Sequence, residues 1–191
     1  MARTKSKSAV AKPAAAKSKI YEDYPASGML LCNLMGVVIA LLGAFILFPY
    51  GIHVSIIYLI YVFYLQFQIA RRACPDCYYY GKTCYCGLGA CPARLFKRGD
   101  PKRFAAKRFT WMDMVPSFMV SLVPIVCGII LLALKFDWTL LAAIVAMGIL
   151  GFPAQGIVHG WGCRHCKQRE LGCPAEKLFD VEKAGKKKAK G

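Results

Sequence analysis

One triplet of cysteines occurs twice in this chain with identical spacing, and it is the feature best suited to chemistry. The two copies share the pattern C-x2-C-x6-C and consist of Cys74, Cys77 and Cys84 and, 89 residues later, of Cys163, Cys166 and Cys173. Packing alone would not require the same cysteine spacing in two places, whereas metal ligation and thiol chemistry depend on spacing. We therefore expect the working site of the protein at these two segments.

Metal ligation is the chemistry that this spacing favours. A tetrahedral zinc site needs four ligands, with sulfur atoms about 2.3 Å from the ion, and a C-x2-C turn delivers only two of them. The first segment can add Cys86 or Cys91, whereas the second has His165 and His159 nearby. Three sulfurs with one imidazole, a crossover of Cys91, or two four-cysteine sites would each complete a tetrahedron. The expected metal ligands are Cys74, Cys77, Cys84, Cys86, Cys91, Cys163, Cys166, Cys173 and His165.

The identity of the metal stays open between zinc and an iron–sulfur cluster. The spacing of a zinc ribbon, with two C-x2-C pairs roughly 15–20 residues apart, is absent. The ferredoxin run C-x2-C-x2-C-x3-C-P is absent too, although Cys91 and Cys173 are each followed by proline, as at its end. A dithiol redox role and chemically inert cysteines are the alternatives. Cys32 and Cys127 lie inside long apolar runs, where a lone cysteine is usually a packing residue.

Four apolar runs must position the cysteine segments. Of the 191 residues, 57% are hydrophobic, and the runs contain no Lys, Arg, Asp or Glu. A helix needs roughly 20 apolar residues to cross a hydrocarbon core of about 30 Å. The sequence therefore predicts an all-α integral membrane protein with four transmembrane helices. They are expected at Gly28–Phe48, Ile52–Ala70, Val115–Leu134 and Trp138–Val158.

The positive charges indicate how these helices are oriented. Of the 26 Lys and Arg residues, six lie in 1–19, ten in 71–108 and nine from 164 onward, which leaves only Lys135 elsewhere. By the positive-inside rule, both termini and the central loop face the cytoplasm, as expected for a protein of the cell or inner membrane. Because the cytosol is reducing, cysteines on that side favour metal ligation over structural disulfides.

The repeated cysteines also predict the organisation of the chain. We expect two tandem transmembrane hairpins, each followed by a cytoplasmic cysteine-rich loop. Proline fits the first turn of a helix, so short helices are expected from Pro92 and from Pro174. The predicted segments are a disordered basic tail at 1–24, hairpin 1 at 25–73, a cysteine-rich loop with a basic segment at 74–111, hairpin 2 at 112–160, the second cysteine motif with a short helix at 161–182, and a basic tail at 183–191.

Cations alternate with aromatic residues in the segment that precedes the third run. Lys102-Arg103-Phe104 and Lys107-Arg108-Phe109 are followed closely by Trp111. Aromatic rings at headgroup depth, with Lys and Arg reaching lipid phosphates, are typical of an interfacial segment. We expect anionic lipid headgroups as the partner of this segment and no nucleic acid, because its residues are tied to a transmembrane span.

Three functions remain after the sequence is searched for other chemistry. It has no recognisable nucleophile and base, no phosphate-binding glycine loop and no carboxylate in the spans, so stand-alone catalysis and carboxylate-coupled transport are disfavoured. The leading hypothesis is a membrane redox or electron-transfer subunit whose cytoplasmic cap holds an iron–sulfur cluster or another thiolate-bound metal. The second is a zinc-stabilised scaffold that docks a cytoplasmic or membrane protein. The third is a metal or thiol sensor or transporter.

Overall fold

Four long helices dominate the computed structural model, which describes residues 19–87, 92–107 and 110–174. Each is long and apolar enough to cross a membrane, as the sequence predicts, and together they indicate a membrane protein. They are α1 (Ala26–Leu47), continued by the 3-10 turn η1 (Phe48–Tyr50); α2 (Ile52–Arg72); α5 (Trp111–Leu134); and α6 (Trp138–Ile149), continued by the π-helical segment η3 (Leu150–Ala154) and α7 (Gln155–Arg164).

The helices bury little of their apolar surface against one another. Only 28% of the most apolar stretch of the first span is buried, and the corresponding share of the second is 11%. Side chains such as Phe63 and Ile157, each 73% exposed, point away from the bundle. Such a large exposed apolar surface requires a nonpolar solvent, which a lipid bilayer supplies.

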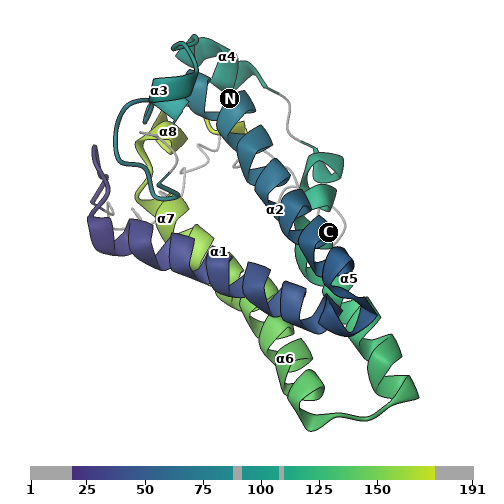
Figure 1. The fold of residues 1–191 in the computed structure, drawn as a ribbon. Helices are drawn as coiled ribbons and strands as arrows, with labels where there is room; N and C mark the ends of the chain where they lie inside the picture. Colours follow the sequence, from purple (N-terminus) through teal and green to yellow (C-terminus); the bar gives the residue numbers. More distant parts are fainter. Residues whose placement is uncertain (1–18, 88–91, 108–109, 175–191) are drawn as a thin grey trace, which may run out of the picture.

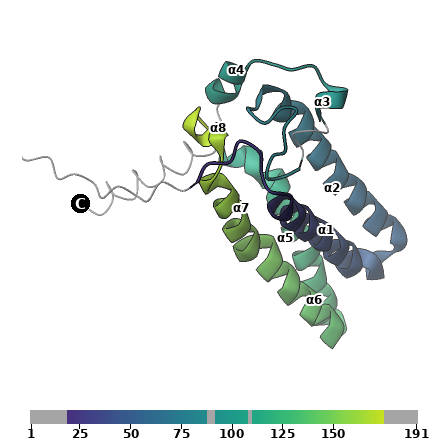
Figure 2. The same cartoon turned by 90° about the vertical axis from the view of Figure 1, so that its left-hand side faces the viewer.

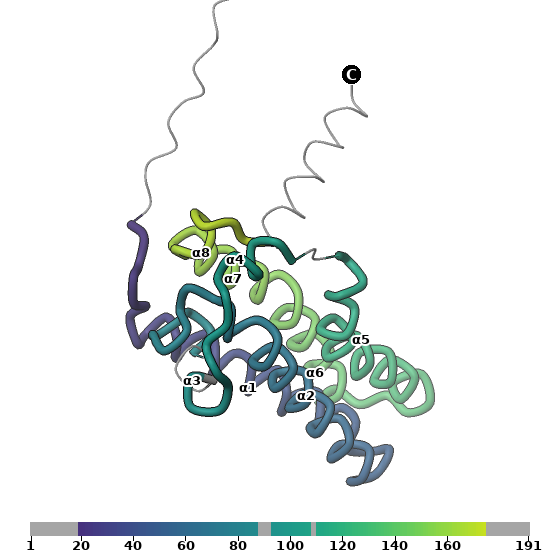
Figure 3. Tube along the Cα trace, turned by 90° about the horizontal axis from the view of Figure 1, so that it is seen from above, coloured from purple at the N-terminus to yellow at the C-terminus, as the bar shows by residue number. Residues whose placement is uncertain are grey.

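The remaining described elements gather at one end of the helices, opposite the connection between α5 and α6 (Figure 1, Figure 2). They are the 3-10 turn η2 (Cys74–Asp76), α3 (Pro92–Leu95), α4 (Pro101–Ala106) and α8 (Lys167–Glu170). We call residues 19–25, 73–87, 92–107 and 165–174 the cap. Figure 3 views the molecule from above, with α4 and α8 close together. A Cβ atom on Gly172, just after α8, would lie 3.3 Å from Ala105 of α4.

The cap includes residues that the sequence assigns to the basic tail. Tyr21 forms a parallel bridge with Cys166, and its amide donates to the carbonyl of His165 (3.0 Å). Tyr24 is only 4% exposed. Its aromatic ring supplies the apolar area that holds residues 19–24 against the rest of the cap.

The first of the predicted short helices is present. α3 begins at Pro92, as expected for a proline whose missing N–H is not needed in the first turn. The equivalent helix expected from Pro174 lies almost entirely outside the described residues. α4 begins with Pro101 behind an Asp100 cap, whose carboxylate accepts from the amide of Lys102 (2.9 Å).

The main hydrophobic core lies where α1 meets α5 and α6. Its buried side chains recur at helical spacing and are Ile39, Ile46, Leu140, Ala143, Ile144 and Met147. Gly128 lets α5 approach this core, because a Cβ atom there would lie 2.7 Å from Ile144 and 2.9 Å from Ile46. Small residues permit such close helix packing inside a membrane.

Tyrosine hydroxyls join α2 to α5. The hydroxyls of Tyr58 and Tyr61 donate to the carbonyls of Val120 and Pro116, each at 2.9 Å. The Val120 carbonyl needs a donor because Pro124, four residues later, has no N–H to give it. Tyr58 on α2 thus supplies the donor that Pro124 on α5 lacks.

Tyr58→Phe is expected to destabilise the helix bundle by about 1 kcal/mol, since it leaves the Val120 carbonyl without this donor. Tyr64→Phe is the control, because the Tyr64 hydroxyl accepts only from Gln68 on its own helix. In a Pro124→Ala background the alanine N–H replaces the tyrosine donor, and the cost of Tyr58→Phe should shrink. Unfolding of the purified protein in increasing dodecyl sulfate measures all four variants. An equal cost of Tyr58→Phe in both backgrounds would contradict the explanation.

The fourth span is longer than the sequence predicts, and this matters for the cysteines. Pro116 and Pro124 lie within an uninterrupted α5, whereas Pro153 lies in the π-helical segment η3. The wider turn of a π-helix accommodates proline, which has no N–H to donate in the i→i−4 pattern. Such π-helical segments often adjoin functional sites. The helix then continues past the predicted end at Val158 to Arg164. The second cysteine motif therefore starts on a helix instead of in a loop.

Candidate metal centre

Buried tyrosine side chains form the floor of the cap. Tyr24, Tyr79 and Tyr85 are between 2% and 8% exposed, and the Tyr24 ring lies 5.5 Å from each of the other two. The Tyr24 hydroxyl donates to the carbonyl of Gly162 on α7 (2.6 Å), and the Tyr79 hydroxyl donates to the carbonyl of Tyr21 (2.6 Å). Half-buried cysteines from several segments pack against these rings, namely Cys32, Cys77, Cys84, Cys86 and Cys166.

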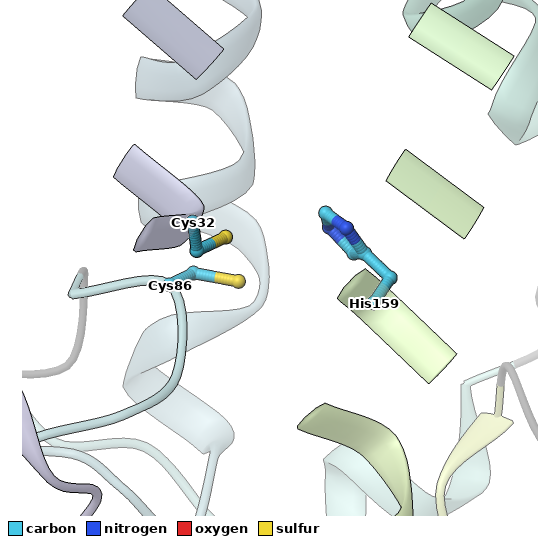
Figure 4. A group of neighbouring side chains, drawn as sticks. All are labelled: Cys32, Cys86 and His159. Atoms are coloured by element: carbon cyan, nitrogen blue, oxygen red, sulfur yellow. The ribbon is translucent and has the colours of Figure 1, made fainter. Parts of the chain in front are cut away.

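Three potential metal ligands come together beside this floor. The sulfur atoms of Cys32 and Cys86 and an imidazole nitrogen of His159 lie within 4.8 Å of one another. They come from α1, the loop after α2, and α7 respectively. In Figure 4 the two thiols lie side by side with the imidazole ring facing them. Both thiols are half-buried and the histidine is exposed, so an ion could enter from the histidine side.

The chain conformation next to Cys86 explains how the loop reaches α1. Gly87 has a φ angle of 71°, which favours glycine, and a Cβ atom there would lie 2.7 Å from the amide nitrogen of Asn33. Only a residue without a side chain lets the backbone lie so close to α1. Cys86 is thereby held next to Cys32, one residue before Asn33.

Hydrogen bonding and burial raise the pKa of three half-buried thiols of the cap. A hydrogen bond with Cys32, together with burial, raises the pKa of Cys86 well above its ordinary value. Burial raises the pKa of Cys77 to about 11, with smaller contributions from the charges of nearby cysteines. Burial also raises the pKa of Cys166. A metal ion must displace these protons, so binding is coupled to proton release.

The structure divides the predicted ligands between several places. Cys86 joins Cys32 and His159. Cys77, Cys84 and Cys166 pack against the tyrosine floor, but among the described residues only Cys32, Cys86 and His159 bring three ligand atoms within 4.8 Å of one another. Cys74 begins η2, and Cys163 lies exposed on α7. Cys91 lies outside the described residues.

His165 contacts a backbone carbonyl and two aromatic rings. Its Nδ1 atom lies 2.8 Å from the carbonyl oxygen of Trp161. The imidazole ring is also close to two aromatic rings, with centroid distances of 4.8 Å to Trp161 and 5.4 Å to Tyr21. A bond from Nδ1 to a backbone carbonyl leaves Nε2 as the ligand atom, as in many metal-bound histidines, but His165 is not in the group of described residues whose ligand atoms lie within 4.8 Å of one another.

Reasoning from the sequence overlooked Cys32 and gave His159 only a secondary place. Cys32 stands alone in an apolar run, so no spacing connects it with another ligand. His159 does carry a signal, because Cys163 follows it by four residues and therefore lies on the same helical face. That pairing could have identified α7 as a ligand-bearing helix. Comparisons of the chain with protein-family models, curated proteins and solved structures found no match.

Proposed function

We propose that this chain is a multi-pass membrane protein that holds a zinc ion at Cys32, Cys86 and His159, with Cys163 as the fourth ligand. The observation that carries the proposal is the approach of three ligand atoms, from three distant segments, to within 4.8 Å of one another. Cys163 lies one helical turn after His159, on the same face of α7. Three thiolates and one imidazole are a common tetrahedral ligand set of structural zinc sites.

The composition of this ligand set favours zinc over an iron–sulfur cluster. Clusters are held by four cysteines or, in the Rieske type, by two cysteines and two histidines. Zinc accepts a mixture of sulfur and imidazole and undergoes no redox change. The ion would connect the loop after α2 to both α1 and α7. Among the three hypotheses, the zinc-stabilised scaffold is therefore preferred to the electron-transfer subunit and to the sensor or transporter.

The proposed protein spans the membrane as two tandem hairpins with the cap and both termini in the cytoplasm. The asymmetric distribution of Lys and Arg supports this orientation. Lys102 and Arg103 are exposed on α4, where they could reach anionic headgroups, and the cap offers a surface for a cytoplasmic or membrane protein. An impermeant maleimide tests the orientation: it should label Phe136→Cys in intact cells but Lys102→Cys only after permeabilisation. The reverse pattern would refute it.

Cys86→Ser is expected to lose one equivalent of zinc relative to the wild-type protein, because serine is a poor zinc ligand. Elemental analysis of protein purified in detergent measures the metal content directly. Cys127→Ser is the matched control, since Cys127 lies in α5 away from the cap. Its bond with the Tyr50 hydroxyl involves the backbone carbonyl, which the substitution keeps. Equal zinc in Cys86→Ser and wild type would refute the site. Iron instead of zinc, with visible absorption, would support the electron-transfer subunit.

A further inference from the structure

The thiol groups of Cys32 and Cys86 form a close pair. Their sulfur atoms lie within 4.8 Å of each other, on side chains that Figure 4 shows side by side. A disulfide bond is about 2.05 Å long, so the two sulfurs would need to approach each other by at most about 3 Å to form one. Both cysteines are free thiols in the structure. The geometry therefore suits a reaction that the two sulfurs carry out together.

Contacts within the chain, without a metal, hold Cys86 beside α1. Gly87 lies so close to α1 that a Cβ atom there would meet the side-chain nitrogen of Asn33 at 2.7 Å. The amide of Gly87 also donates to the carbonyl of Cys84 (3.0 Å), which closes a turn around Cys86. On the other side of Cys86, the ring of Tyr85 is only 8% exposed. The thiol pair is therefore in place before any ion is bound.

The pair has one open side and no competing third thiol. In the described part of the chain, Cys32, Cys86 and His159 are the only three ligand residues whose atoms lie within 4.8 Å of one another, so no third sulfur lies that close to both thiols. The histidine is exposed, whereas both thiols are half-buried. A reagent little larger than water can reach a half-buried sulfur more easily than a bulky one can. The pair therefore suits a small oxidant.

We propose that Cys32 and Cys86 form a peroxide-reactive dithiol, which hydrogen peroxide oxidises to a disulfide. One sulfur attacks the peroxide: an S–O bond forms, the O–O bond breaks, and the leaving oxygen takes up the thiol proton as water. The second thiol then displaces the hydroxyl group of this sulfenic acid, so that the S–S bond forms and a second water leaves. The two cysteines lose two electrons and two protons, and one peroxide becomes two waters.

The neighbouring thiol decides what such an oxidation yields. An isolated sulfenic acid can be oxidised further to sulfinic acid, which is irreversible for most proteins, whereas an adjacent thiol converts it into a disulfide. Thiol–disulfide exchange with cellular reductants reverses the disulfide. On the cytoplasmic side, where the cap is proposed to lie, a disulfide is transient or redox-sensing in most proteins. The pair therefore fits a site that responds to peroxide better than it fits a structural cross-link.

The dithiol rests on the two sulfur atoms and not on the zinc ion of the proposed function. Zinc needs the same sulfurs as thiolates, so a bound ion and a disulfide exclude each other. Oxidation would keep the loop after α2 attached to α1 through the new bond, while His159 on α7 would lose both neighbouring thiolates. Where zinc is bound as proposed, peroxide would therefore release it.

Peptide mapping of the oxidised protein tests the pair. Full-length wild-type protein in detergent is freed of metal with a chelator, treated with hydrogen peroxide and then with N-ethylmaleimide. Peptides that contain Cys32 and Cys86 should be recovered linked, with two hydrogens less than their summed mass, and fragment ions distinguish Cys86 from Cys84. Cys127, which lies in α5, should carry maleimide. Alkylation of both Cys32 and Cys86, or a link from either mainly to another cysteine, would overturn the proposal.

Trapping of the sulfenic acid tests the second step of the reaction. Cys86→Ser leaves Cys32 without its partner thiol, and Cys32→Ser does the same for Cys86. In at least one of the two variants the sulfenic acid should persist and react with dimedone, so that the remaining cysteine is labelled severalfold more than in the wild type. Labelling equal to that of the wild type in both variants would show that the neighbouring thiol does not resolve the sulfenic acid, contrary to the proposal.

Zinc release separates this proposal from the proposed function. If both hold, peroxide should release one equivalent of zinc from the zinc-loaded wild type as the disulfide forms, which a zinc-sensitive dye measures. A Cys32–Cys86 disulfide in metal-free protein, together with unchanged zinc content in Cys86→Ser, would support the dithiol and refute the zinc site. Loss of zinc in Cys86→Ser, without any such disulfide in the wild type, would support the zinc site and refute the dithiol.

Discussion

Replacing Gly162 with alanine is expected to destabilise the cap by about 1–3 kcal/mol, because the new methyl group would overpack a filled space. Gly162 is buried on α7, and a Cβ atom there would lie 2.7 Å from Cγ and Cε1 of Tyr85. The Tyr85 ring cannot retreat easily, since it is 8% exposed and packs between Tyr24 (5.5 Å) and Trp161 (5.7 Å). Any movement of Tyr85 also moves Cys86, so zinc should be bound more weakly.

Gly160→Ala is the matched control for this substitution. Gly160 lies on the same helix two residues earlier, and a Cβ atom there would meet no atom within 4 Å. Alanine at that position should be neutral or stabilise the helix by up to about 1 kcal/mol. Thermal unfolding in detergent and zinc content compare the two variants. If Gly162→Ala were as stable as Gly160→Ala, the close packing of Tyr85 on α7 would be wrong.

Tyr79→Phe is expected to cost about 2–4 kcal/mol, because one buried hydroxyl serves two partners. It accepts from the amide of Lys167 (2.9 Å) and donates to the carbonyl of Tyr21 (2.6 Å), while the side chain is 2% exposed. Phenylalanine leaves both backbone groups without these bonds, at about 1–2 kcal/mol each. The loss separates the second cysteine motif from the first and releases residues 19–24 from the cap.

Tyr78→Phe provides the comparison, because among the described residues the Tyr78 hydroxyl accepts from the half-buried Lys82 side chain (3.2 Å) and bonds no backbone group. That bond is expected to contribute little in water. Hydrogen exchange of the cap amides, measured by mass spectrometry, should increase at residues 19–24 and 165–173 in Tyr79→Phe and remain unchanged in Tyr78→Phe. Equal exchange in the two variants would show that the Tyr79 hydroxyl does not hold the cap together.

A zinc ion at the proposed site would attach the cap to the transmembrane helices. The proposed site at Cys32, Cys86 and His159 connects the loop after α2 to α1 and α7. A hydrogen bond with Cys32, together with burial, raises the pKa of Cys86, and burial raises the pKa of Cys77 and of Cys166. Zinc binding would therefore release protons and strengthen as pH rises towards these raised thiol pKa values.

The sequence predicts the four helices well because their formation depends on local properties. A run of about 20 apolar residues must be helical in a membrane, whatever its neighbours are. The predicted starts at Ile52 and Trp138 agree with the structure, and so does the end at Leu134. The fourth span runs beyond its predicted end because His159 and Arg164 are polar but still helical. Hydropathy identifies the lipid-facing part of a helix but gives no signal for the polar turns that continue the helix into the cap.

The repeated spacing by itself singled out two related cysteine segments, which the structure places at one end of the molecule (Figure 1). Only the tertiary structure decided which side chains come together: Cys86 meets Cys32 and His159, while the residues that follow Cys77 bond those that follow Cys166. The physical reason is that a ligand set is defined by distances between atoms of separate segments. Those distances depend on how α1, α7 and the tyrosine floor pack, which a pattern along one chain does not encode.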